Sequence, residues 1–80
     1  MDNTLINSVS DLISQTLGVS RDQITDGFTY GDVPEWDSMG HMNLMLALEE
    51  KYGIQVSADT ITNLVSIPAI LAYLEDNHHD

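Results

Sequence analysis

The sequence contains no cysteine, only two basic residues and no long apolar run, and each of these shortages excludes a class of protein. Without cysteine the chain can form neither disulfides nor thiolate metal sites, so any thiol chemistry needs a sulfur supplied from outside. No apolar run approaches the ~20 residues that span a bilayer, so we expect no membrane insertion. The N-terminal Met1-Asp2-Asn3 lacks the basic region of a signal peptide, and we expect a cytoplasmic protein.

The shortage of basic residues leaves the chain strongly acidic. Arg21 and Lys51 stand against thirteen acidic residues, which gives a net charge of −11. Such a field repels nucleic acid and anionic membranes, and it steers the protein toward partners with basic surfaces. His78 and His79 could bind a metal weakly, but two adjacent histidines near a chain end are typical of a solvated terminus. We therefore expect no nucleic-acid partner and no metal site.

The 80 residues are enough for one domain, residues 1–80, which we expect to be monomeric. A chain this short buries only roughly 60% of its unfolded surface, so we expect no deep catalytic cavity. Its hydrophobic content of 42% still allows a modest core, which argues against disorder despite the charge.

Hydrophobic spacing predicts helices and no strands. Apolar side chains recur at helical spacing over residues 3–19, and Gly18 lies where that helix is expected to end. A second helix is expected over about 38–52, with Gly53 as its terminator. A short helical piece is expected after Ser57.

The last helix is expected to begin with Ser66 as its cap and Pro68 in its first turn. Its apolar residues fall at i, i+3, i+4 and i+7, namely Ile67, Ile70, Leu71 and Leu74. The predicted fold class is all-α: a small bundle of three main helices plus one short helix, with a long loop between the first two.

That loop, over residues 20–37, is rich in turn formers. Loops of this length inside a compact domain usually have a function. We expect it to pack over the bundle with one turn of helix, and with Trp36 either as an anchor or exposed for contact with a partner. Its other apolar anchors are Ile24, Phe28, Tyr30 and Val33.

Ser38, at the junction of the loop and the second helix, has three readings. As a hydrolase nucleophile it lacks support, because Trp36 replaces the first glycine of the G-x-S-x-G elbow and no strand precedes it. The closeness of Asp37 and His41 in sequence is not the geometry of a triad. Asp37 or Ser38 could instead cap the helix. As an attachment point, Ser38 would lie at a helix N-terminus, where the local field suits a phosphate ester.

A family resemblance favours attachment. The segment DSMGHMNLMLALEEKYGI resembles the signature of the acyl carrier protein family, in which D-S-[LM] opens the second helix. In that family an aliphatic run, a Glu-Glu pair, an aromatic residue and Gly-Ile then follow. GVSRDQIT is similar to the family's entry into its first loop, and VSADTI to its short third helix. The resemblance extends over nearly the whole chain.

The resemblance implies a cofactor and partners. Ser38 would carry 4′-phosphopantetheine, transferred from coenzyme A by a phosphopantetheinyl transferase that uses Mg²⁺. The arm's thiol would hold an acyl group as a thioester, so the chain would be a carrier and no enzyme. Asp37 would orient the site and cap the helix. The other partners would be acyl-loading and acyl-processing enzymes with basic docking surfaces.

The positions matching the family's partner-binding surface follow Ser38 on the second helix. They are Met39, Gly40, Asn43, Leu46, Glu49 and Glu50. Two that are often acidic in the family, Gly40 and Asn43, are neutral here. This difference favours a dedicated pathway, of specialised-metabolite, polyketide or fatty-acid-like type, over general fatty acid synthesis.

Other residues of the second helix have simpler readings. Gly40 is expected at an exposed position, or else at a point of close approach by a partner or the arm. His41 is expected to face solvent or a partner. Met39, Met42 and Met45 are expected in the core or lining a pocket, since methionine adapts to irregular space.

Two alternative functions stay open. A peptidyl or aryl carrier would hold an amino acid, although such carriers often have a Gly-Gly approach to the serine that PEWDS lacks. An unmodified acidic helical module would only bind proteins.

Overall fold

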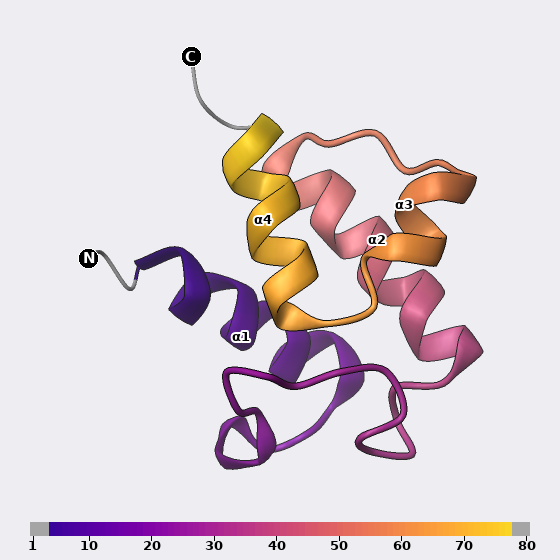
Figure 1. Ribbon diagram of the computed structural model, residues 1–80. Coiled ribbons are helices and arrows are strands. Elements are labelled where there is room, and N and C mark those ends of the chain that lie inside the picture. The colour runs from indigo at the N-terminus through magenta and orange to yellow at the C-terminus, as the bar shows by residue number, and fades with distance from the viewer. Residues whose placement is uncertain (1–3, 78–80) are drawn as a thin grey trace.

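The computed structural model describes residues 4–77 and consists of helices joined by loops (Figure 1). In chain order these are α1 (Thr4–Leu17), the 3₁₀ helix η1 (Arg21–Gln23), α2 (Ser38–Tyr52), α3 (Ala58–Asn63) and α4 (Ile67–Asn77). Within this range the only β feature is one isolated antiparallel bridge between Thr29 and Ser66. The all-α prediction of three main helices and a short one is confirmed. Over the same range no helix is both long and apolar enough to cross a bilayer.

Glycines end α1 and α2 where the sequence predicted. Gly18 and Gly53 have φ angles of 72° and 71°, in the left-handed region that only glycine enters without a steric penalty. The amide of Gly18 donates to the carbonyl of Ser14 (2.9 Å), and that of Gly53 to the carbonyl of Glu49 (2.9 Å). These bonds satisfy carbonyls that the helix ends would otherwise leave unpaired.

Short side chains begin α3 and α4. Ser57 and Thr60 form a reciprocal capping box, in which the Ser57 amide donates to Thr60 Oγ1 (2.7 Å) and the Thr60 amide donates to Ser57 Oγ (3.4 Å). Ser66 Oγ accepts from the amide of Ala69 (3.2 Å). Pro68 lies in the first turn of α4, where its missing N–H has no helical partner to lose.

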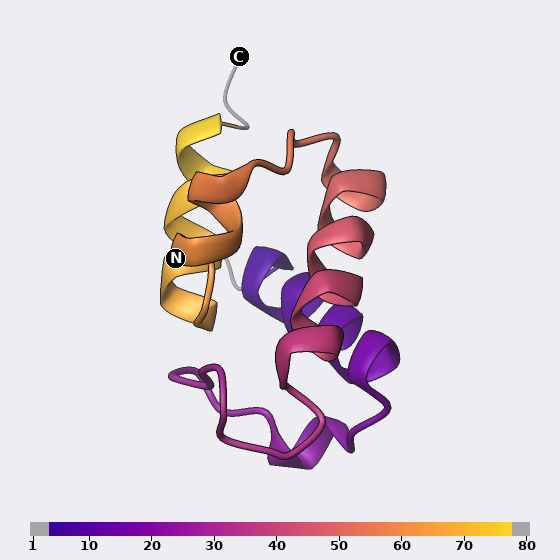
Figure 2. The same cartoon turned by 90° about the vertical axis from the view of Figure 1, so that its right-hand side faces the viewer.

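The helices enclose one core, with α2 along one side of the molecule and α3 and α4 along the other (Figure 2). Each long helix contributes the apolar residues of its inner stripe, and the loops contribute the rest. The helical members of this core are Val9, Ile13, Leu17, Leu44, Met45, Leu48, Ile67, Ile70 and Leu74. The predicted stripe of α4 is therefore largely buried.

The long loop between α1 and α2 closes one end of the bundle (Figure 1). Ile24, Phe28 and Val33 are buried as predicted, whereas Tyr30 remains 42% exposed. The loop is also bonded to the start of α4: the amide of Tyr30 donates to the carbonyl of Val65 (2.8 Å), and the amide of Ile67 donates to that of Phe28 (2.9 Å). The predicted turn of helix is η1. The loop is thus a packed part of the structure.

Candidate functional site

The N-terminus of α2 leaves the hydroxyl of Ser38 exposed. Asp37 is the N-cap in extended conformation, and its Oδ1 accepts from the amide of Gly40 (2.9 Å). Ser38 is the first helical residue, and its Oγ lies 3.4 Å from the hydroxyl of Tyr30. Because Asp37 caps the helix, Ser38 is not needed as a cap. The capping reading therefore applies to Asp37, and the attachment reading remains for Ser38.

The surroundings of Ser38 do not form a catalytic triad. The imidazole of His41 has both nitrogens engaged elsewhere: Nδ1 accepts from Trp36 Nε1 (3.0 Å), and Nε2 lies 2.7 Å from the carbonyl oxygen of Ile61. The Asp37 carboxylate bonds to the helix amide and not to the histidine. A triad needs the histidine on the hydroxyl and the aspartate on the histidine. The arrangement therefore provides no base for Ser38.

The expectation that His41 faces solvent or a partner is wrong. His41 is only 5% exposed, and it lies between Trp36 and α3. Trp36 itself is 1% exposed, which confirms it as the anchor of the loop. A signal was present in the sequence, because His41 precedes Leu44, Met45 and Leu48 at i+3, i+4 and i+7, the inner stripe of α2.

The expectation that Gly40 lies at an exposed position is also wrong. Gly40 is buried, and a Cβ there would collide with the carbonyl oxygen of Glu35 and lie 3.0 Å from Cδ2 of Leu17. The close approach considered from the sequence is thus made by the chain's own loop. Contact between backbones at this distance requires a residue without a side chain.

The methionines of α2 divide between core and surface. Met45 is fully buried, as expected. Met39 and Met42 are 74% and 43% exposed, so neither lies in the core; Met39 lines a recess beside Ser38, and the prediction of core or pocket lining is wrong for Met42. With Leu46, which is 57% exposed, they form an apolar stripe at i, i+3 and i+7, beginning one residue after Ser38. We call Met39, Met42 and Leu46 the outer stripe of α2.

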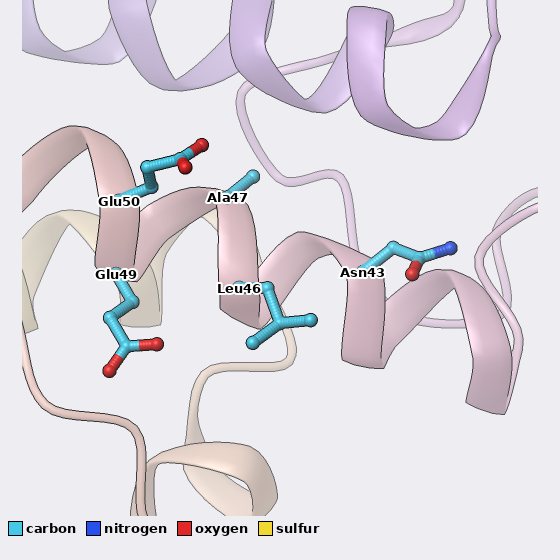
Figure 3. Close-up of a pocket in the computed structure, with 5 residues that line it drawn as sticks. All are labelled: Asn43, Leu46, Ala47, Glu49 and Glu50. Carbon is cyan, nitrogen blue, oxygen red and sulfur yellow. The ribbon is translucent and has the colours of Figure 1, made fainter.

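Polar and acidic side chains adjoin the outer stripe toward the end of α2. A shallow hollow there is lined by Asn43, Leu46, Ala47, Glu49 and Glu50. Figure 3 shows Leu46 and Glu49 pointing to one side of the helix and Ala47 and Glu50 to the other. Of the sequence-predicted partner residues, all except Gly40 are exposed on this helix.

A second hollow adjoins the junction that bears Ser38. It has a volume of about 220 Å³ and lies between the end of α1 and the start of α2. Its lining residues are Thr16, Leu17, Glu35, Asp37, Met39, Gly40 and Asn43. The site therefore combines an exposed hydroxyl, the amide-rich start of a helix and an adjacent recess. These features suit an attached phosphate ester, since a helix N-terminus favours negative charge.

Comparisons with known proteins agree with this geometry. The family model described as a phosphopantetheine attachment site matches residues 7–74. An acyl carrier protein of Akkermansia muciniphila is 30% identical over 74 residues, covering 92% of each chain. One from Helicobacter pylori strain G27 is 27% identical over 73 residues, covering 91% of this chain and 94% of that protein.

A solved structure shares the fold. The solution NMR structure of a holo acyl carrier protein from Geobacter metallireducens superimposes with a TM-score of 0.75 and 21% identity over 92% of each chain. Two findings decide the family assignment. The family model matches most of the chain, and the relatives are covered over nearly their whole length. This chain belongs to the acyl carrier protein family, and its cofactor is covalently attached 4′-phosphopantetheine.

Proposed function

We propose that Ser38 is the residue that carries 4′-phosphopantetheine. The observation that supports this best is the exposed hydroxyl at the first position of α2, which is not needed as the helix cap and whose one contact is with the Tyr30 hydroxyl at 3.4 Å. When bound, the arm supplies a terminal thiol that holds the cargo as a thioester. The cysteine-free chain has no thiol of its own to compete for that cargo. The protein is a carrier that presents acyl intermediates to successive enzymes.

The attachment step uses the hydroxyl of Ser38 as the nucleophile. Its oxygen attacks the phosphorus of coenzyme A that bears the pantetheine, a new P–O bond forms, and 3′,5′-ADP leaves as the diphosphate bond breaks. The hydroxyl proton passes to a base of the phosphopantetheinyl transferase, which also supplies the Mg²⁺, because both ring nitrogens of His41 are engaged and the Asp37 carboxylate caps the helix. The role of Asp37 is to hold the helix start in place and thereby orient Ser38.

We infer that the outer stripe of α2, with Asn43, Glu49 and Glu50, forms the docking surface for the transferase and the acyl-processing enzymes. Exposed methionine and leucine beside carboxylates suit a partner with an apolar patch ringed by basic residues. The chain's own basic residues leave the Ser38 end free: Arg21 pairs with Asp11 (3.0 Å), and Lys51 is at the far end of α2. The proposal includes a cytoplasmic location for the carrier and these partners.

Only one of the two neutral positions still supports the choice of a dedicated pathway. Gly40 is neutral because the loop packs on it, so its lack of charge does not report on partners. Asn43 is exposed and remains the neutral position that favours a dedicated pathway of specialised-metabolite, polyketide or fatty-acid-like type. The alternative cargo is an aminoacyl group.

Intact mass spectrometry tests the attachment. The protein is incubated with coenzyme A, Mg²⁺ and a broad-specificity phosphopantetheinyl transferase. We expect a gain of one phosphopantetheine, abolished in Ser38→Ala and retained in the matched control Ser20→Ala, which removes another exposed serine at a helix start. A gain that persists in Ser38→Ala would refute Ser38 as the site, and no gain in the wild type would favour the protein-binding module.

A further inference from the structure

The imidazole of His41 makes two hydrogen bonds that together specify its protonation state. The indole N–H of Trp36 can only donate, so Nδ1 (3.0 Å) is the acceptor. The carbonyl of Ile61 can only accept, so Nε2 (2.7 Å) carries the proton. Only the neutral ring with its proton on Nε2 satisfies both partners. A protonated ring would turn Nδ1 into a donor facing the indole N–H.

These bonds join three segments around Ser38. Trp36 lies in the loop two residues before Ser38, His41 lies one turn after it on α2, and Ile61 belongs to α3. The ring of Trp36 stacks on His41, with centroids 6.2 Å apart and planes 29° apart. Tyr30, whose hydroxyl is 3.4 Å from Ser38 Oγ, meets the imidazole edge-on at 5.6 Å. The cluster thus connects α3 to the loop that presents the serine.

We propose that His41 is a positioning residue for Ser38, whose neutral ring joins the loop at Trp36 to α3 at Ile61 through these two hydrogen bonds. The inference rests on Ser38 being the attachment residue. Loss of these two hydrogen bonds leaves Ser38 on α2 but allows the loop, including Tyr30, to move. The transferase must then order this segment itself, so loading slows.

The first test uses the unmodified protein and needs no partner. Trp36 is the chain's single tryptophan, so the indole N–H resonance reports on its hydrogen bond to His41 alone. A His78→Asn, His79→Asn background leaves His41 as the only imidazole. We expect ¹⁵N shifts of an Nε2–H tautomer, and an indole resonance that loses its hydrogen-bonded shift in His41→Phe. An Nδ1–H tautomer, or an indole resonance unchanged in His41→Phe, would overturn the proposal.

The second test measures loading rates of this background and of its Trp36→Phe variant, which keeps an aromatic ring but loses the N–H donor. We expect the variant to load about fivefold more slowly, the factor for one net hydrogen bond. Equal rates would overturn the inference while loading continues. Failure of the attachment proposal is distinct, because the wild type would then gain no mass.

Discussion

Replacement of Gly40 by alanine should destabilise this protein, contrary to what helix propensity alone predicts. In an exposed helix the change would raise the free energy of unfolding by up to about 1 kcal/mol. Here the added Cβ collides with the carbonyl oxygen of Glu35 and lies 3.0 Å from Cδ2 of Leu17. The carbonyl belongs to the backbone of a packed loop and cannot rotate away, so the loop or the start of α2 must shift.

The size of the effect follows from two opposing terms. Overpacking a core typically costs about 1–3 kcal/mol, and a collision with backbone places Gly40→Ala at the upper end of that range. After subtraction of the propensity gain, we expect the free energy of unfolding to fall by about 2 kcal/mol. For a domain of this size that corresponds to a melting temperature lower by roughly 8–16 °C.

Urea and thermal unfolding followed by circular dichroism measure this change. The matched control is Gly27→Ala, since a Cβ at Gly27 meets nothing within 4 Å. That variant should be as stable as the wild type or slightly more so, because alanine restricts the unfolded chain. If Gly40→Ala were as stable as Gly27→Ala, the packing of the loop at Glu35 against α2 would be wrong.

Three further predictions address the cap, the core and the charge. Asp37→Ala should lower the free energy of unfolding by about 1 kcal/mol, whereas Asp37→Asn retains an acceptor for the Gly40 amide and should be near neutral; equal urea midpoints would contradict the cap. Met45→Ala should cost about 2–5 kcal/mol and Met42→Ala less than about 1 kcal/mol, because only Met45 is fully buried, and similar losses would refute this division. Salt or Mg²⁺ should raise the melting temperature by screening thirteen acidic residues against two basic ones, and a flat response would count against self-repulsion.

The elements of the fold could be predicted because their signals are local. Apolar periodicity, the glycines at 18 and 53 and the cap residues Ser57 and Ser66 act within one or two turns of the chain. The position of the candidate site could be predicted for a similar reason. A capping aspartate followed by an exposed serine is a feature of a few consecutive residues, and the family resemblance supplied its chemical meaning.

On α2 the wrong assignments concern both faces of the helix. Its residues are apolar around most of the helix, so periodicity could not say which methionines face inward. Met39 and Met42 are exposed because the long loop covers α2 at Gly40 and His41. The carbonyl that bonds to His41 Nε2 belongs to Ile61, twenty residues away in the sequence, so local spacing does not reveal this contact.

By itself, the sequence determined the helical architecture, a cap at Asp37 or Ser38, the acidity and the absence of any thiol. The tertiary structure decided that the loop returns over the start of α2, so that Glu35 excludes a side chain at position 40 and Trp36 reaches His41. The physical reason is that helix signals depend on neighbours within a turn, whereas packing depends on which distant surfaces meet. Whether Ser38 is held in place or left loose depends on those distant contacts.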